Sequence, residues 1–556
     1  MCVSKYFKHH LTLFEILPNE LFLEIFDYLN GVDIIYAFSQ LNNRFQHLLI
    51  NYVHTFDFTS ITKAKFDCVT QHHDIHRWKS LRLSEDEQTP GQIRLFAQLF
   101  PFSQYISQLQ SLSIINMKPS FAKIILSQFI SFDHLISLTI TTICGENIQP
   151  FKLPSLKQLV FTGCKHNNWI KNFHCLESVE YTIKDACHVN YVLTLPKTLK
   201  HLKLFYNEAR DGNAVRTSLS QMSQLTKLAL YDNGDCSILP DGRQWEELIK
   251  SSLPLLKTFQ FCFYFLFNHN TLDDINQAIS SFSTPFYLVE KCWFTRCDSN
   301  NQYSALGAFY TLPFTFSKIR IDTKSCDIGI STLATSNTDE RKHGSSEKVE
   351  TLLFKEKCQM PSQASVTSNI VRLVLNGGLL ASSYSSLNNL RHLEIRRNIR
   401  MSVTDFADLL ENASQLQSLT LLISVLIKLT DSFTNKTVCD QLSKRIQSLT
   451  IADSLSNHDY DRNMDQANIL SNIVRVFGNT CEHLSLHLST APKTVLPILQ
   501  NMKQLRSLHI HCPSWRCKSN VSATSWFQQS ISAIDASDFI YTPDDLNFYV
   551  WFGKRP

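Results

Sequence analysis

The sequence is poor in the residues and runs on which several protein classes depend. Only 14 of its 556 residues are glycine, which weighs against nucleotide-binding α/β folds, because their phosphate-binding turns need glycine. Its most apolar runs, at 258–267 and 416–429, fall short of the ~18 residues of a membrane helix, and residues 1–14 contain no apolar core of a signal peptide. We therefore expect a soluble, intracellular chain, cytoplasmic or nuclear, that does not bind membranes.

The signatures of catalytic and cofactor sites are also missing. The sequence contains no G-x-x-x-x-G-K-[ST], no G-x-S-x-G and no H-E-x-x-H. Its 16 cysteines are scattered without the spacing of a disulfide framework, so we expect reduced thiols. A net charge of +4 on 53 basic and 49 acidic residues does not indicate a nucleic-acid partner. These absences favour a non-enzymatic protein without a cofactor or metal and without bound nucleic acid.

Two partial metal-site patterns are weak. The acidic tract 459–465 resembles the start of a calcium loop, but Met464 stands where the turn needs glycine and Leu470 where a bidentate glutamate is required. The His72, His73 and His76 group and the cysteine pairs 292/297 and 512/517 each lack a second matched set of zinc ligands. A solvated loop and ordinary packing are the favoured interpretations.

The stretch from Phe14 to Leu49 predicts three short helices. The first begins at Pro18 and ends with Gly31 as a C-terminal cap, the second begins behind Asp33, and the third begins near Asn42. One apolar stripe on the first helix consists of Leu21, Phe22, Ile25, Phe26 and Leu29. Three helices in fewer than about forty residues do not make an independent core, and the stretch has no cysteine, so we expect a protein partner.

These residues resemble the F-box family. The family pattern is matched by Leu17, Pro18, Glu20, Leu21, Ile25, Phe26 and Leu29, and later by Asn43, Arg44, Phe45 and Leu48. Leu41 stands where the family more often has valine. The resemblance covers residues 14–49 and implies that the helices dock on the small adaptor subunit of a cullin-RING ubiquitin ligase, and reach cullin through it. The implied contact residues are Leu17, Pro18, Glu20, Leu21, Ile25, Phe26, Leu29, Leu41 and Phe45. The alternative is a helical cap on the repeats described next.

An apolar pattern Φ-x-x-Φ-x-Φ recurs between Trp78 and Ile510. Its sixteen central residues are Leu81, Leu112, Leu138, Leu159, Val179, Leu202, Leu228, Phe259, Ile319, Leu352, Leu373, Leu393, Leu419, Leu449, Leu484 and Leu508. The long gap between Phe259 and Ile319 leaves room for a degenerate copy. The pattern resembles leucine-rich repeats, which together with the N-terminal stretch implies an F-box protein with C-terminal leucine-rich repeats.

The expected fold class is α/β. An N-terminal three-helix F-box is followed by an irregular leucine-rich-repeat solenoid, a horseshoe with a parallel β-sheet on its concave face. The expected domains are the F-box at 11–55, a connector at 56–77, the solenoid at 78–512 and a C-terminal cap at 513–556, made of a helix and an edge strand. The polar run 336–348 is expected to be a mobile loop. The alternative is a chain of separate α/β domains with coincidental leucine spacing.

Strand alternation predicts which side chains line the concave face. Basic residues outnumber acidic ones there; the basic ones are Arg82, Lys203, Lys227, Lys318, Arg320, Lys355, Arg372 and Arg396, and the acidic ones are Glu180, Asp322 and Glu394. We expect this face to prefer an acidic or phosphorylated segment, with Arg320, Lys355, Arg372 and Arg396 as substrate-binding residues. The alternative is a solvated face with a chance imbalance.

Together these features predict a substrate-recognition adaptor of an SCF-type E3 ubiquitin ligase. The F-box would bind the adaptor subunit and the repeats would bind a protein substrate whose identity the sequence does not give. The alternative function is a ligase-independent leucine-rich-repeat scaffold. The absence of any site motif disfavours an enzyme.

Overall fold

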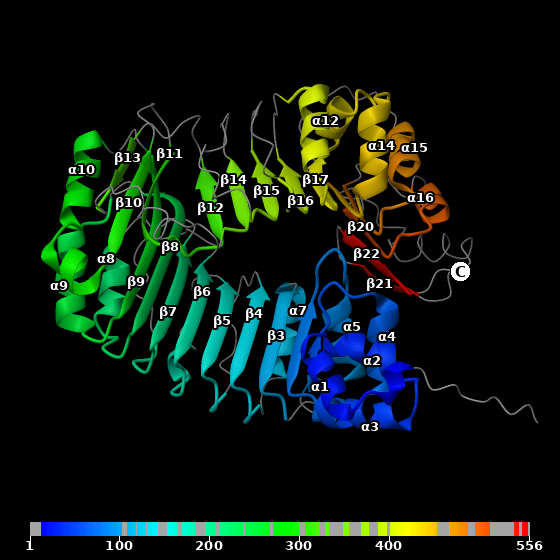
Figure 1. The fold of residues 1–556 in the computed structure, drawn as a ribbon, viewed down its shortest axis with the longest axis horizontal. Coiled ribbons are helices and arrows are strands. Elements are labelled where there is room, and N and C mark those ends of the chain that lie inside the picture. Colours follow the sequence, from blue (N-terminus) through cyan, green and yellow to red (C-terminus); the bar gives the residue numbers. More distant parts are fainter. Residues whose placement is uncertain are drawn as a thin grey trace, which may run out of the picture.

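The computed structural model describes residues 13–102, 108–117, 119–128, 132–142, 153–163, 170–183, 195–206, 212–236, 239–266, 271–299, 306–321, 328–332, 349–354, 369–376, 387–396, 401–452, 466–487, 495–511, 539–543 and 547–553. These residues form an N-terminal helical region and two long β-sheets with helices on their outer side, and together they curve into a ring whose two ends meet (Figure 1).

The first sheet has 12 strands in the order β1-β2-β3-β4-β5-β6-β7-β8-β9-β11-β10-β13. Strands β1 to β9 pair in parallel, and β11, β10 and β13 finish the sheet in antiparallel pairing. The bounds are β1 (Thr55–Asp57), β2 (Ser80–Ser84), β3 (Ser111–Met117), β4 (Ser137–Thr142), β5 (Gln158–Gly163), β6 (Ser178–Ile183), β7 (His201–Tyr206), β8 (Lys227–Cys236), β9 (Thr258–Leu266), β10 (Phe294–Ser299), β11 (Leu306–Leu312) and β13 (Ile328–Ser331).

The second sheet has 10 strands in the order β12-β14-β15-β16-β17-β18-β19-β20-β22-β21. Strands β12 to β20 pair in parallel, and the last two pair antiparallel. The bounds are β12 (Lys318–Ile321), β14 (Thr351–Phe354), β15 (Arg372–Leu375), β16 (His392–Ile395), β17 (Ser418–Leu422), β18 (Ser448–Ala452), β19 (His483–His487), β20 (Ser507–His511), β21 (Phe539–Pro543) and β22 (Asn547–Phe552).

The helices precede or connect these strands. They are α1 (Asn19–Asp27), α2 (Gly31–Phe38), α3 (Asn43–Tyr52), α4 (Lys63–His72), α5 (Gln92–Leu99), α7 (Pro119–Ser127), α8 (Gly212–Leu219), α9 (Gly242–Ser252), α10 (Leu272–Ser281), α12 (Val403–Asn412), α13 (Ile423–Leu429), α14 (Lys436–Arg445), α15 (Gln466–Phe477) and α16 (Leu496–Asn501). Short turns of 3-10 helix lie at Leu13–Ile16 (η1), Ile75–Arg77 (η2) and Ile170–Asn172 (η3), and a π-helical turn lies at Phe286–Lys291 (η4).

All sixteen central residues of the sequence pattern lie in parallel strands and align with one another. In the first sheet the row runs from Leu81 through Leu112 to Phe259, and in the second from Ile319 through Leu352 to Leu508. Nearly all of them are buried, with Leu112 and Leu508 both 0% exposed. Each repeat buries its apolar residues against its neighbours, which is how a solenoid builds a continuous core. The chain is therefore a mixed α/β solenoid with long parallel sheets, the architecture that leucine-rich repeats build.

The sequence pattern missed one copy and misjudged the gap. Val53, Phe56 and Phe58 follow the same spacing, are buried, and place β1 in register with β2 inside the expected connector. Within the described part of the gap after Phe259, the structure has antiparallel strands β10 and β11 in place of a further parallel copy. A buried cluster centred on Tyr231, Tyr264 and Phe316 packs at the junction between the two sheets.

The three N-terminal helices form, but their boundaries differ from the expectation at Gly31. This residue starts α2 rather than ending α1, because Asn30 accepts a hydrogen bond from the Val32 N–H and caps the second helix. A side chain at Gly31 would place its Cβ 2.1 Å from the carbonyl oxygen of Thr55, so glycine allows α2 to approach β1. The third helix begins behind Asn42 as expected, with the Asn42 side chain accepting from the Phe45 N–H.

The two ends of the solenoid are in contact. Trp551 of β22 is fully buried and belongs to the core of the first sheet, where its ring lies 5.6 Å from that of Phe66 on α4. The loop after β2 reaches the second sheet as well: Thr450 donates a hydrogen bond of 2.7 Å to the Glu87 carboxylate, across 363 positions of sequence. Ser507 donates to the main-chain oxygen of Glu87. These contacts close the ring seen at the right of Figure 1.

Three expectations fall on residues that the structure does not describe. The polar run 336–348, the calcium-like tract 459–465 and the helix of the C-terminal cap all lie outside the described residues. In place of the single edge strand expected in the cap, the structure has the antiparallel pair β21 and β22.

Candidate protein-interaction surfaces

Two stripes of apolar side chains run along α1. Phe22 and Phe26 face the interior and are 0% and 7% exposed, and the Phe22 ring packs at 4.8 Å against the ring of Phe45. On the other side, Leu21 and Leu29 are 41% and 44% exposed. The sequence placed these four α1 residues on one stripe and predicted Leu21, Phe26 and Leu29 as contact residues, but the spacing of four separates an inner pair from an outer one.

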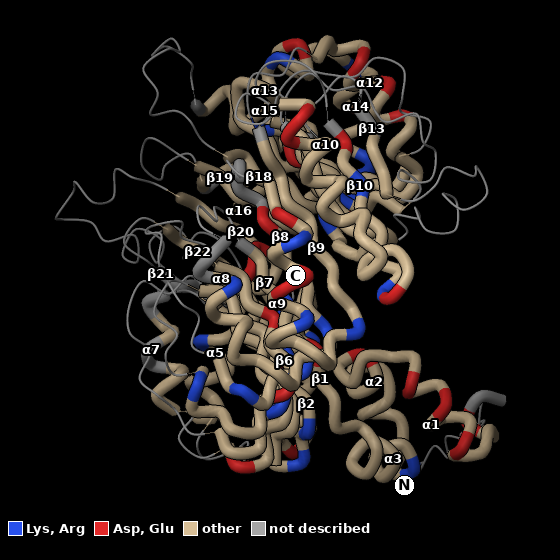
Figure 2. Tube along the Cα trace, turned by 90° about the vertical axis from the view of Figure 1, so that its left-hand side faces the viewer, with Lys and Arg blue, Asp and Glu red and all other residues tan. Residues whose placement is uncertain are grey.

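The outer stripe extends beyond the helix. We define the N-terminal apolar surface as Ile16, Leu17, Leu21, Ile25, Tyr28 and Leu29, which follow one another at helical spacing. Ile16 and Tyr28 are 64% and 90% exposed, whereas Leu17 and Ile25 are half-buried against the core. Figure 2 places α1 at the edge of the molecule, away from both sheets. A neighbouring molecule can therefore reach this surface.

The other residues that the resemblance implied have different positions. Pro18 caps α1 and is exposed, and Glu20 is exposed in its first turn. Leu41 is 50% exposed in the turn between α2 and α3. Phe26 and Phe45 are corrected from surface contacts to core residues, because their rings are sealed within the helical region.

Arg44 explains why an arginine stands next to Phe45. Its guanidinium donates to the main-chain oxygens of Glu15 and Leu17 and to the Asn19 side chain, and it lies 5.3 Å from the centre of the Phe22 ring. Arginine offers several donors in a fixed fork, which suits three acceptors on one segment. Arg44 thus holds the segment that presents Leu17 against α3.

A second surface lies on the concave face of the second sheet. We define the basic cluster as Lys318 and Arg320 of β12, Arg372 of β15, and Arg396, which follows β16. Arg372 and Arg396 each donate to the Glu394 carboxylate, at 2.7 and 2.5 Å. The structure thus brings together three of the four residues expected to bind substrate. The fourth, Lys355, lies outside the described residues.

The titratable groups of the basic cluster affect one another. Burial lowers the pKa of Lys318, and the nearby Arg396, Arg372 and Arg320 lower it further. Burial of Glu394 acts to raise its pKa, but the hydrogen bonds from Arg372 and Arg396 outweigh burial, so the pKa is lowered. Burial and Arg372 also lower the pKa of His392. The cations of the cluster therefore act against one another's charge, while Arg372 and Arg396 stabilise the charged form of Glu394.

Sequence reasoning missed the loop that faces this cluster. The acidic loop, residues 84–88, is shaped by Asp86, which accepts hydrogen bonds from Ser84, Gln88 and Thr89. Its Glu87 then reaches Thr450 of the second sheet. The acidic sequence SEDE is visible in the chain, but nothing local indicates which distant strand it meets.

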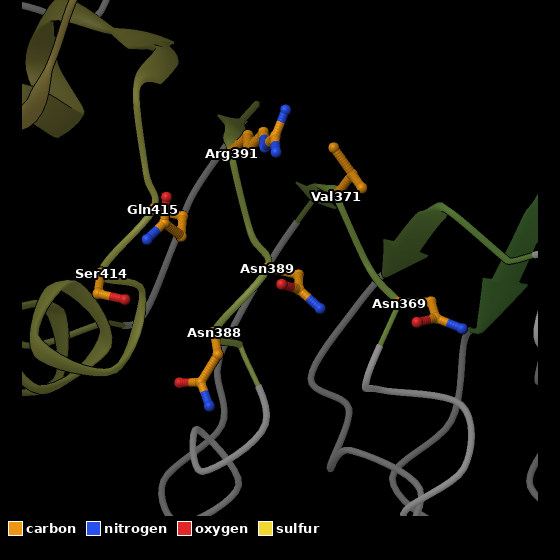
Figure 3. A pocket seen from close by; sticks show the side chains of 7 residues that line it. All are labelled: Asn369, Val371, Asn388, Asn389, Arg391, Ser414 and Gln415. Carbon is orange, nitrogen blue, oxygen red and sulfur yellow. The ribbon is translucent and has the colours of Figure 1, made fainter. Parts of the chain in front are cut away.

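A pocket among the described residues of the second sheet has no catalytic arrangement. A shallow pocket of about 570 Å³ lies before strands β15 to β17, lined by Asn369, Val371, Asn388, Asn389, Arg391, Ser414 and Gln415. Figure 3 shows these side chains pointing in different directions, and none is a carboxylate, an imidazole or a thiol. The pocket thus lacks a nucleophile paired with a base.

The histidines considered as zinc ligands have ordinary partners. Buried His73 accepts a hydrogen bond of 3.0 Å from the Trp78 indole, and burial lowers its pKa. Across the described ranges, no three His, Cys, Asp or Glu side chains gather to hold a metal ion. No helix in the described part of the chain has the length and apolar character needed to cross a membrane.

Comparison with known proteins adds little to this description. No protein-family model matches the chain, and no curated protein matches it. The chain is similar to a solved structure titled "Crystal structure of TLR13-ssRNA13 complex", with 12% sequence identity and a TM-score of 0.22, over 83% of this chain and 74% of that chain. A TM-score this low shows neither a shared fold nor a shared function.

Proposed function

We propose that this chain is the substrate-recognition subunit of an SCF-type E3 ubiquitin ligase. The N-terminal apolar surface binds the small adaptor subunit, which connects the chain to cullin, and the solenoid binds a protein target. The chain performs no chemistry itself. It holds the target near the ligase's charged ubiquitin carrier, at an effective concentration on the order of millimolar for short tethers.

One observation carries this proposal: α1 buries one apolar stripe and leaves a second one exposed. Helix-in-groove recognition uses such a stripe, with anchors at spacings of three and four residues. The F-box-like order of residues supports the adaptor of a cullin-RING ligase as the occupant. Arg44 also supports the proposal, because its hydrogen bonds to the main-chain oxygens of Glu15 and Leu17 fix the segment that carries Leu17.

The test is co-purification of the full chain with the adaptor and cullin. Replacing Leu17, Leu21 and Ile25 with alanine removes three anchors that are exposed or half-buried, so the fold retains most of its stability. Interface anchors contribute about 2 kcal/mol or more each, so we expect both partners to be lost from the purified sample. Val289→Ala is the matched control, because Val289 is apolar and 76% exposed but lies far away on η4. Retention of the adaptor by the triple variant would contradict the proposal.

A second candidate is a ligase-independent scaffold in which the helices only cap the solenoid. It is favoured by the shared core, because Phe22, Phe45 and Trp78 belong to one continuous cluster rather than to two. The same purification separates the two functions: a scaffold would bring down neither adaptor nor cullin, with or without the triple substitution.

A further inference from the structure

The basic cluster and the acidic loop lie on the same concave face. Glu87 lies close enough to Arg372 and Glu394 for their charges to act on its carboxyl group. Its hydrogen-bond partners are the hydroxyl groups of Thr450 and Ser507. The chain's own acidic loop thus already places a carboxylate on this face.

The charges on the face are unbalanced. Two cations of the basic cluster, Arg372 and Arg396, share the single Glu394 carboxylate. Arg372 and Arg396 keep side-chain exposures of 53% and 51%, so each guanidinium has donors available to solvent. A further carboxylate on this face would relieve the mutual repulsion of the cations.

The spacing between neighbouring strands sets the length of a peptide segment that can span this face. Five strand intervals separate β12 from β18 in the order β12-β14-β15-β16-β17-β18. At ~4.8 Å per interval this is about 24 Å, the length of about seven extended residues. One end of such a segment would meet Lys318 and Arg320, and its other end would reach Thr450, where Glu87 now lies.

We propose that this concave face binds an Asp/Glu-rich protein segment through the basic cluster, and that the acidic loop is a built-in competitor covering one end of the site. This inference rests on the proposed function, because the Asp/Glu-rich segment would belong to the protein target that the solenoid captures. The Glu87 carboxylate is bound by the Thr450 hydroxyl group rather than by a cation, so a segment carrying several carboxylates can displace it.

A peptide suits the face better than a nucleic acid. Proteins that bind single strands stack bases on aromatic side chains, whereas the aromatic ring next to Arg320 belongs to the buried Tyr264. The face beyond the cluster continues with small hydroxyl side chains at Thr420, Thr450 and Ser485. These groups suit a peptide backbone and its carboxylates.

The experiment is fluorescence anisotropy with the full chain and a labelled seven-residue Asp/Glu peptide. The same peptide with Asn and Gln, a phosphoserine peptide and an oligouridine serve as comparison probes. The double variant Arg372→Gln/Arg396→Gln should weaken binding of the acidic peptide at least tenfold, because it removes two charge-assisted contacts. Glu87→Gln should tighten it about threefold to tenfold, because the competitor loses its charge. Lys203→Gln is the control, since Lys203 pairs with Glu180 on the first sheet.

Several outcomes would overturn the inference. These are unchanged affinity in the double arginine variant, unchanged or weaker affinity in Glu87→Gln, equal binding of the neutral peptide, binding of the phosphoserine peptide alone, and preferred binding of oligouridine. Near-UV circular dichroism confirms that each variant is folded. The adaptor is absent from this assay, so a negative result here leaves the proposed function intact. Loss of adaptor binding in the triple variant likewise leaves this peptide site intact.

Discussion

Trp551→Ala should open the ring while leaving the solenoid folded. Trp551 is 0% exposed and packs against Phe66 of α4 in the core of the first sheet, although it belongs to the second. Truncating a buried tryptophan costs about 3–5 kcal/mol, and this loss weakens the contact between the two ends because the ring lies in the core of the first sheet. What remains there includes the two hydrogen bonds of Glu87, worth about 1 kcal/mol each.

The rest of the chain does not depend on this contact, because each repeat packs on its neighbours. Small-angle scattering should therefore report a larger maximum dimension for Trp551→Ala, and amide hydrogen exchange should rise in α4. Trp245→Ala is the matched control: Trp245 is 6% exposed and packs on Phe259, away from the ring closure. It should lower stability without changing the dimension. An unchanged scattering profile for Trp551→Ala would refute the reasoning.

Three further predictions concern single residues. Arg44→Ala removes hydrogen bonds to the Leu17 segment, so amide exchange in residues 13–19 should rise and adaptor binding should weaken; unchanged exchange would contradict the role of Arg44. Gly31→Ala should cost about 1–3 kcal/mol of unfolding free energy, because its Cβ would meet the Thr55 carbonyl at 2.1 Å; a melting temperature equal to wild type would show that α2 is not held this close. Burial, aided by Arg506, lowers the pKa of His483 from 6.5 to about 4. Stability from neutral His483 is therefore complete above pH 6.5 and is lost as the pH falls towards 4, by about 3 kcal/mol at most. In urea titrations at several pH values, His483→Gln should lose less unfolding free energy than the wild type as the pH falls. An identical dependence of unfolding free energy on pH in both proteins would contradict this role of His483.

The strand array could be predicted from sequence because its signal is repeated and local. Each copy places apolar residues at the same spacing, and the structure aligns Leu81, Leu112 and their successors in one row. The copy at Val53, Phe56 and Phe58 has the same spacing and is therefore visible in the sequence, but it directly follows the helical pattern, which predicts a connector there. The antiparallel strands β10 and β11 have no repeat to predict them.

The candidate surfaces were predicted only in part. Spacing alone grouped Phe26 with Leu29, and only packing against Phe22 and Phe38 shows which side of α1 is buried. The helix boundary at Gly31 was misread because a glycine after a helix is usually a cap, whereas here it allows a close approach to Thr55. The contact of Glu87 with Thr450 depends on the curvature summed over all repeats, which no local pattern encodes.

The most direct test of the central claim is isothermal titration of the purified full chain with the purified adaptor subunit. We predict one-to-one binding by the wild-type chain. The variant in which Leu17, Leu21 and Ile25 are replaced with alanine should give no measurable heat of binding. Equal affinity of the two proteins, or no binding by the wild-type chain, would contradict it.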